Sequence, residues 1–181
     1  MKAILFLLPF IPFALIGQQE TNNLNVKGLM TCDSIHYNNI PSRVCAYVNR
    51  VDTTTIITAG TYYFLQGGFA NTNTINFGFS GDTLQYQNGN HKTLKGGYGF
   101  TVKSNKNTCT VSCAVYLNNS IEASSIGSFF CKTAGEVYTI ENNNWMLYVH
   151  NNDLIKIRVT CDISDTEIIL VSGSTSLFQL P

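Results

Sequence analysis

Charged side chains are scarce in this sequence. Only 12% of its 181 residues are Asp, Glu, Lys or Arg, about half the usual ~25%. Eleven basic residues balance eleven acidic ones, and no basic arm is present. Proteins that bind nucleic acid concentrate Lys and Arg against the phosphates. We therefore expect no nucleic acid as a partner.

The sequence also lacks the patterns of an enzyme. No helix-length amphipathic segment occurs within residues 51–180. There is no Gly-x-Ser-x-Gly nucleophile elbow and no Cys or Cys/His spacing typical of zinc sites. The histidines His36, His91 and His150 stand isolated in the sequence. We expect a protein that is not an enzyme and that holds no cofactor or metal.

What the sequence does contain is one short β-strand pattern after another. The segments are rich in Val, Ile, Thr, Tyr and Phe, and clusters of Gly, Asn, Asp and Ser supply turns between them. In residues 154–161, alternate positions place Ile155, Ile157 and Val159 on one face and Lys156 and Arg158 on the other. This alternation is typical of a sheet with one buried side. Strands are predicted at 44–50, 53–58, 61–66, 73–79, 83–87, 98–104, 108–118, 126–131, 136–140, 145–150, 154–161, 167–171 and 176–180.

Such a series predicts an all-β jelly-roll sandwich of about ten antiparallel strands. The N-terminus differs, because residues 3–16 form an apolar run after Lys2 and before a polar stretch that begins at Gln18. As a helix the run would be about 21 Å long, short of the ~30 Å hydrocarbon core. We expect a signal peptide, or else a hydrophobic anchor, at 1–17. An arm or linker would follow at 18–43, and the jelly-roll domain at 44–181. As an anchor, residues 3–16 would contact a membrane or lie in an apolar groove of a partner.

Six cysteines behind such a leader favour disulfides. We predict Cys32–Cys45 across a local loop and Cys109–Cys131 across a hairpin that turns at Asn118-Asn119. Cys109 and Cys113 lie about 13 Å apart along one strand, too far to bridge. Both would face the core. Asn118-Asn119-Ser120 is also a glycosylation sequon, which has meaning only in a host that glycosylates proteins.

Three further groups of residues could have a function, and a purely structural role is the alternative for each. Aromatic side chains could form a sugar-stacking platform, although we favour a core position for the tryptophan (Trp145, Tyr148, Tyr98 and Tyr116). Acidic residues near a turn could hold calcium, although they lack the usual loop pattern and a solvated turn is favoured (Asp162, Asp165 and Glu167). A carboxylate pair for a polysaccharide hydrolase would come from Asp33, Asp52, Asp82, Glu122, Glu136, Glu141 and Asp153, none of which stands out.

The order of several segments resembles the compact jelly-roll heads of phage fibres and other virion proteins. The resemblance begins at residues 53–63 (TTTIITAGTYY) and continues at 79–86 (FSGDTLQY), in the strand with Tyr98, Phe100 and Val102, and at 114–121 (AVYLNNSI). It ends at 152–159 (NDLIKIRV) and 174–180 (STSLFQL). About 130 residues are covered.

This resemblance implies a ten-stranded sandwich related to the globular heads of the complement and tumour-necrosis-factor families. Those heads assemble as homotrimers around an axis lined by apolar and aromatic residues. The residues expected in the core or at the trimer axis are Tyr62, Phe64, Tyr98, Phe100, Phe178 and Leu180. Loops expected to face a ligand or solvent contain Asn71, Asn73, Asn88, Asn90, Asn142 and Asn144.

The leading hypothesis is a non-enzymatic homotrimer, structural or receptor-facing, on a virus particle. Its partners would be other virion proteins or a host-surface glycan or receptor. Cysteines and a secretion-type leader are unusual for a virion protein, and they keep a second hypothesis open. In it, the protein is a secreted cellular binding protein, such as a lectin-like adhesin or a subunit of an extracellular filament.

Overall fold

The computed structural model describes residues 42–180 apart from 49, 68 and 81. They belong to one compact unit, Asn38–Pro181. The predicted leader, most of the predicted arm, Cys32 and His36 lie outside the described residues. No helix in the described part of the chain is long and apolar enough to cross a membrane.

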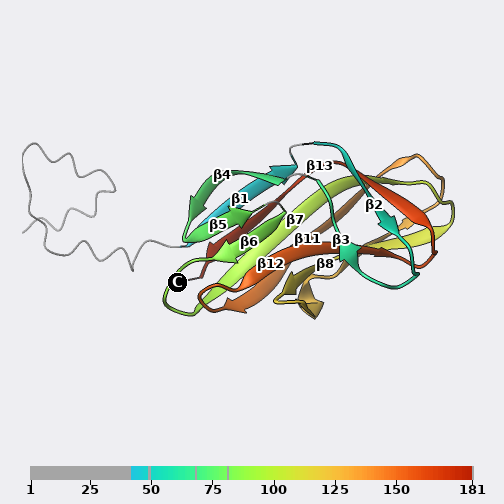
Figure 1. Cartoon of the computed structure of the whole chain (residues 1–181). Helices are drawn as coiled ribbons and strands as arrows, with labels where there is room; N and C mark the ends of the chain where they lie inside the picture. The colour runs from blue at the N-terminus through green and yellow to red at the C-terminus, as the bar shows by residue number, and fades with distance from the viewer. Residues whose placement is uncertain (1–41, 49, 68, 81, 181) are drawn as a thin grey trace, which may run out of the picture. The chain divides into compact units, whose positions relative to one another are not determined.

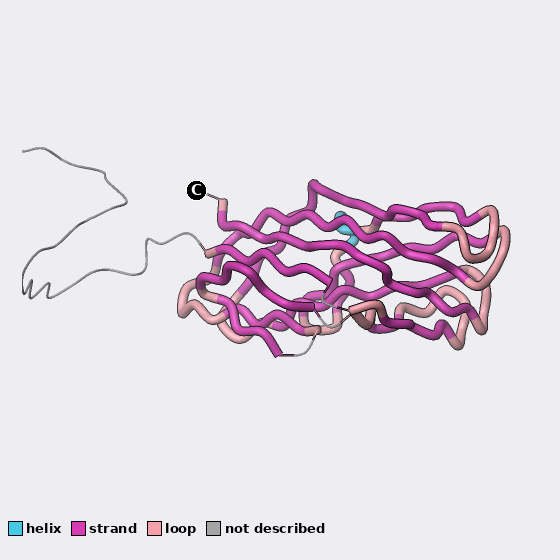
Figure 2. Tube along the Cα trace, turned by 90° about the horizontal axis from the view of Figure 1, so that it is seen from above, coloured by secondary structure: helices cyan, strands magenta, loops and turns pink. Residues whose placement is uncertain are grey.

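Nearly the whole described chain is antiparallel strand (Figures 1 and 2). A short 3-10 turn, η2 (Ala123–Ser125), interrupts the series. The strands are β1 (Arg43–Val48), β2 (Asp52–Ile56), β3 (Tyr63–Phe64), β4 (Phe69–Ile75), β5 (Phe77–Ser80), β6 (Thr83–Tyr86), β7 (Lys92–Ser104), β8 (Cys109–Leu117), β9 (Ser120–Ile121), β10 (Gly127–Cys131), β11 (Val137–Val149), β12 (Leu154–Cys161) and β13 (Thr166–Gln179).

The strands form two stacked sheets (Figure 1). The six-stranded sheet has the order β11-β7-β13-β1-β4, and β2 pairs with the other half of β13. The seven-stranded sheet has the order β10-β8-β12-β6-β5, with β3 beside β12 and β9 beside β8. The C-terminal strand therefore lies between β7 and β1, far from both in sequence. The predicted all-β jelly-roll sandwich is confirmed.

The core lies between the sheets because the strands alternate. Along β7, every second side chain is buried, including Leu94, Tyr98, Phe100 and Val102. β8 supplies the facing layer, where Cys109, Val111, Cys113 and Val115 are all fully buried, as expected. Burial of apolar surface at roughly 25 cal/mol per Å² is the main force that holds the two sheets together.

Two pairs of predicted strands are single long strands in the structure. The segments expected at 136–140 and 145–150 are both β11, and those at 167–171 and 176–180 are both β13. Each long strand carries an irregularity in its register, between Asn142 and Trp145 and between Leu170 and Ser172. A β-bulge adds a residue without ending the strand. The added residue interrupts the alternation of apolar and polar residues, and in the sequence this interruption resembles a turn between two strands.

Gly96 leaves the space that Trp145 fills. The two residues are paired across β7 and β11, and Trp145 is 1% exposed. A Cβ atom at position 96 would lie 2.2 Å from the indole ring. We expect Gly96→Ala to lower the free energy of unfolding by roughly 1–3 kcal/mol, because the ring must move in a packed core.

Urea titration of the variant measures this loss. Gly89→Ala is the control, since a Cβ atom there would meet nothing within 4 Å. Equal stability of the two variants would show that Trp145 does not depend on the glycine.

Candidate interaction surface

The outer face of the six-stranded sheet carries large apolar side chains. Four of them are exposed: Tyr47 (42%), Phe178 (46%), Met146 (56%) and Tyr148 (52%). Their positions follow from alternation, because the inward neighbours Ala46, Leu177, Leu147 and Val149 are buried. We call Tyr47, Met146, Tyr148 and Phe178, with the small residues between them, the apolar outer face.

Small, uncharged residues occupy the middle of this face. In register across the sheet, Cys45 lies beside Ser176, which lies beside Gly97, and the next position pairs Ser174 with Gly99. Such residues let another backbone or ring approach closely. Charged residues also point outward from these strands: Arg43 and Lys95 flank Phe178 in register, and Glu141 pairs with Gly99. Lys103 and Glu167 point outward near the other end of the sheet. An uncharged strip flanked by aromatic side chains resembles the core of a protein interface.

A second apolar surface lies at one edge of the sandwich. β10 and β11 end the two sheets and lie against each other. Large side chains are exposed on and just before these strands: Ile126 (41%), Phe130 (51%) and Val137 (57%). We call these three residues the apolar edge. By strand alternation, Phe130 points to the outer side of the seven-stranded sheet and Val137 to the outer side of the six-stranded sheet, so this edge carries apolar side chains on both of its sides.

Polar and aromatic residues cover part of the other sheet. The Tyr62 and Tyr116 rings lie 5.7 Å apart, and the Arg158 guanidinium lies 4.3 Å from the Tyr116 ring centre. Arg158 also donates a hydrogen bond to Asn119 Oδ1 (2.7 Å). The Lys156 ammonium lies 5.9 Å from the Phe64 ring centre. Cations already stack on these rings, so this face is better suited to solvent than to an apolar partner.

The six residues predicted for the core or trimer axis do not come together. Tyr98 and Phe100 are core residues with stacked rings, and the Tyr98 hydroxyl donates to the carbonyls of Cys113 and Ser125 (3.0 and 2.7 Å). Tyr62 and Phe64 are half-buried on the seven-stranded sheet. Phe178 is on the outer face of the other sheet and is not a core residue, so its place at the trimer axis stays a prediction. Leu180 follows β13 and is half-buried, and its N–H donates to the Thr93 carbonyl (3.1 Å).

Most of the asparagines predicted in loops lie on strands. Asn71 and Asn73 belong to β4 and pair with β1, while Asn142 and Asn144 stand at the irregularity of β11. Asparagine disfavours strands by propensity, but pairing with neighbouring strands overrides that preference here. Only Asn88 and Asn90 occupy a loop, between β6 and β7, and Asn88 is 9% exposed. Whether any of these side chains faces a ligand stays a prediction.

The structure separates the residues of the expected sugar platform. Trp145 and Tyr98 are in the core, Tyr148 is on the outer face of one sheet, and Tyr116 is on the other sheet. Trp145 therefore has the core position that we favoured. The sugar-stacking platform, the alternative to that position, is not formed by these four residues.

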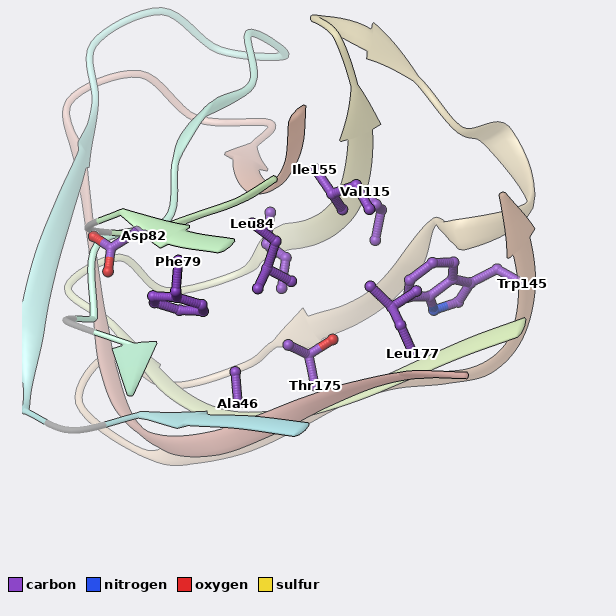
Figure 3. A pocket seen from close by; sticks show the side chains of 10 residues that line it. Ala46, Phe79, Asp82, Leu84, Val115, Trp145, Ile155, Thr175 and Leu177 are labelled. Atoms are coloured by element: carbon purple, nitrogen blue, oxygen red, sulfur yellow. The ribbon is translucent and has the colours of Figure 1, made fainter. Parts of the chain in front are cut away.

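A small cavity remains between the sheets beside Trp145 (Figure 3). Leu177, Thr175 and Ala46 line it from one sheet and Leu84, Val115 and Ile155 from the other, as Figure 3 shows. Its volume is about 20 Å³, enough for about one water molecule. Ligand pockets are typically ~300–1,000 Å³, so this cavity is a packing gap rather than a binding site.

Several carboxylates proposed for hydrolysis have local structural partners instead. Asp52 pairs with Arg50 (2.9 Å), Glu122 accepts from the Ser124 hydroxyl (2.8 Å), and Glu136 accepts from the Tyr138 hydroxyl (3.0 Å). Asp153 accepts from the His150 backbone N–H (2.7 Å) and the Asn118 amide (2.6 Å). These bonds fix turns and strand ends.

The predicted disulfide Cys109–Cys131 joins two positions that are directly opposite in the β8–β10 register. In the structure both are free, buried thiols, and Cys45 is a free, exposed thiol. The hairpin turn at Asn118-Asn119 is confirmed between β8 and β9, with both residues at positive φ (49° and 74°). That is the backbone of the two-residue turns that suit strand twist. Both disulfide pairings stay predictions.

Burial of Cys113 makes stability depend on alkaline pH. Burial raises the pKa of this thiol to about 12, from 9.0. The folded state thus holds a proton that the unfolded chain releases. This stabilisation is complete below about pH 9 and is lost as pH rises toward 12, by about 1.4 kcal/mol per pH unit.

Cys113→Ala removes that proton from the folded state. We expect the free energy of unfolding to fall less steeply above about pH 9 in the variant than in the wild type. Urea titrations at a series of alkaline pH values measure the two slopes. Parallel slopes would show that Cys113 ionises normally in the folded protein.

Comparison with known proteins shows the fold. No protein-family model matches the chain, and no curated protein matches it by sequence. Among solved structures, murine APRIL aligns with 78% of this chain and 100% of its own, at 9% identity and a TM-score of 0.51. Eiger TNF from S. frugiperda aligns with 77% of this chain and 94% of its own, at 7% identity and a TM-score of 0.52. The chain has a tumour-necrosis-factor-like jelly-roll fold.

A virion protein is also similar to this chain, at a lower level. The PRD1 vertex protein P5 aligns with 77% of this chain and 97% of its own, at 14% identity. The TM-score of 0.43 is lower than for the two proteins above. Identities in this range relate folds and leave function to be argued from the surface.

Proposed function

We propose that this protein is a non-enzymatic homotrimer that serves as a structural or attachment protein of a virus particle. The observation that carries the proposal is the presence of two unlike apolar surfaces on one protomer, the outer face and the edge. Exposed apolar patches on soluble proteins mark interaction sites. Here the partner is a second copy of the chain.

The outer face and the edge differ, so each can serve as the partner of the other on a neighbouring copy. A contact between the edge of one copy and the face of the next is heterologous, and it closes into a ring when the rotation permits. Three-fold closure would cover Phe178 and Tyr47 of each copy with Phe130 or Val137 of its neighbour. Each protomer then has both surfaces buried, which removes the aggregation risk of a chain with formal net charge zero.

The position on a virion is supported by the order of segments at 53–63, 79–86, 114–121 and 152–159, which resembles phage-fibre heads. In such an arrangement the trimer axis buries the apolar outer face, and the loops stay available for other virion proteins or for a host-surface glycan or receptor. Loops on a rigid sandwich are the usual place for binding residues. The loop at Asn88–Asn90 is one candidate.

A secreted cellular binding protein is the second candidate. The apolar leader at 3–16 favours it, as does the register of Cys109 with Cys131, which would let a disulfide form. The same trimer would serve an adhesin or an extracellular filament subunit. The two candidates differ in where the molecule is found.

Mass spectrometry of purified particles and of culture supernatant from the same source separates them. The virion proposal expects the chain at a fixed stoichiometry in particles that have been freed of soluble protein. Recovery only in the supernatant, without residues 1–17, would contradict it and support secretion. Intact mass with and without reductant then reports any disulfide.

A further inference from the structure

Three buried cysteines converge at one end of the seven-stranded sheet. Cys109 begins β8, Cys131 ends β10 and Cys161 ends β12, and each is 0% exposed. In sequence they are 22 and 30 residues apart with no metal-binding spacing. Only the pairing of three neighbouring strands brings them together.

Cys109 is the central member of this cluster. Its sulfur atom lies within 4.8 Å of that of Cys161, and Cys131 stands directly opposite Cys109 in the β8–β10 register. Cys109 Sγ and Cys131 Sγ also approach the same acceptor, the Lys106 carbonyl oxygen, at 3.8 and 3.3 Å. Three sulfur atoms therefore surround one small region rather than forming a single pair.

A carboxylate completes the group. One oxygen of Asp162 and the sulfur atoms of Cys109 and Cys161 all lie within 4.8 Å of one another. Asp162 Oδ1 accepts the Thr110 backbone N–H (2.8 Å), and the Asp162 N–H donates to the Thr110 carbonyl (3.1 Å). These two bonds hold the carboxylate beside β8. An outer hydrogen bond of this kind orients a metal ligand.

We propose that Cys109, Cys131, Cys161 and Asp162 form a structural zinc site. Zn²⁺ in structural sites is tetrahedral, with four ligands drawn from Cys sulfur, His nitrogen and Asp or Glu oxygen, and this cluster offers three sulfur atoms and one oxygen. Ligands 2.0–2.3 Å from the ion stand about 3.5–3.8 Å apart in a tetrahedron. Cys161 Sγ and Asp162 Oδ1 are already 3.7 Å apart. The Cys109 sulfur needs to close by up to about 1 Å around the ion, and the Cys131 sulfur, which lies outside the group of ligand atoms within 4.8 Å of one another, needs to move further.

Binding replaces the thiol protons with one ion. Each of the three thiols releases its proton to solvent and forms one S–Zn bond, with no change in oxidation state. The ion would tie the ends of β8, β10 and β12 to the segment that follows β12. This site does not depend on trimer assembly, because none of its ligands belongs to the apolar outer face or the apolar edge.

A disulfide between Cys109 and Cys131 is the competing state of the same sulfur atoms. It would use neither the Cys161 thiol nor the Asp162 carboxylate, which would keep their bonds to each other and to Thr110. The zinc site uses all four groups. The two states exclude each other, so one chemical measurement decides between them.

The first test is the metal content of the full chain, purified without added metal or chelator, by elemental mass spectrometry. We expect one zinc ion per chain and three thiols that resist alkylation until a chelator is added. Co²⁺ added to the metal-free chain should give thiolate-to-cobalt charge-transfer absorption and the visible bands of tetrahedral cobalt. No bound zinc together with no such absorption would overturn the proposal, as would a Cys109–Cys131 linked peptide from the native protein.

Two variants and a matched control locate the ligands. Cys161→Ser should abolish Co²⁺ absorption, and Cys113→Ser should leave it unchanged, since Cys113 is an equally buried cysteine outside the cluster. Asp162→Asn changes an exposed side chain and keeps the fold even if Cys161→Ser does not. We expect it to weaken Co²⁺ binding at least roughly tenfold. Unchanged affinity in Asp162→Asn would refute the four-ligand site.

Discussion

Replacing Phe178 with glutamate is expected to convert the trimer into a folded monomer. The side chain is 46% exposed in the protomer and stands on the apolar outer face. In the proposed trimer it would be an aromatic anchor, and losing such an anchor typically costs about 2 kcal/mol or more, roughly a 30-fold loss of affinity. Burying a carboxylate in the interface adds a desolvation penalty, even with Arg43 and Lys95 beside it in the register. Sedimentation velocity at several concentrations measures the change.

The matched control for this variant is Ile57→Glu. Ile57 is also a large, exposed apolar residue (63%), but it follows β2 and lies on neither apolar surface. It should leave the trimer intact. The two variants must both keep the β-sheet circular dichroism of the wild type. A trimer that survives Phe178→Glu would refute the assignment of the outer face.

Replacing Leu177 with alanine is expected to destabilise the fold of the protomer rather than to dissociate the trimer. Leu177 is 1% exposed, and it lines the small cavity beside Trp145 (Figure 3). Truncating a buried leucine costs roughly 2–5 kcal/mol, a large part of a typical stability of about 5–15 kcal/mol. The residue stands on β13, between β7 and β1. We expect a large drop in the free energy of unfolding with no direct effect on assembly.

The measurement is best made in the monomeric Phe178→Glu background, because the stability of an oligomer depends on its concentration. There, Leu177→Ala is compared with Ser176→Ala, the outward neighbour, which should change stability by less than about 0.5 kcal/mol. Equal losses at 176 and 177 would contradict the alternation of β13. Position 177 thus tests the stability of the fold, and the neighbouring position 178 tests assembly.

The fold was predictable because alternation repeats in almost every segment. Strands such as 154–161 place apolar residues on one face with little exception, and pairing within a sheet follows from that pattern. The full lengths of β11 and β13 were not predictable, because the irregularities near Asn142 and Leu170 shift the alternation of inward and outward residues within each strand. A sequence read one segment at a time interprets such a shift as a turn.

The interaction surface was predictable only in part. Phe178 was expected at the core or the trimer axis, but the choice depends on register. Alternation puts Phe178 on the same face as Ser174 and Ser176 and opposite Leu177, but only the structure shows that the Leu177 face is the buried one. Tyr47 and Met146 join Phe178 only through pairing across the sheet. No local sequence pattern indicates that these three residues lie on the same face.

The cysteine cluster could not be predicted from spacing. Its three sulfur atoms come from the ends of three strands, and sequence distance says nothing about which ends coincide. Counting cysteines led to pairs, whereas the strand order β10-β8-β12 places three of them together. The arrangement belongs to the topology rather than to a motif.

The mass of the protein in solution tests the central claim most directly. Sedimentation equilibrium of the purified chain over a wide range of concentrations should give a single species with the mass of three chains, stable to dilution. A monomer at all concentrations would leave the apolar outer face and edge exposed without a partner of the same chain. That result, or a closed dimer, would contradict the account.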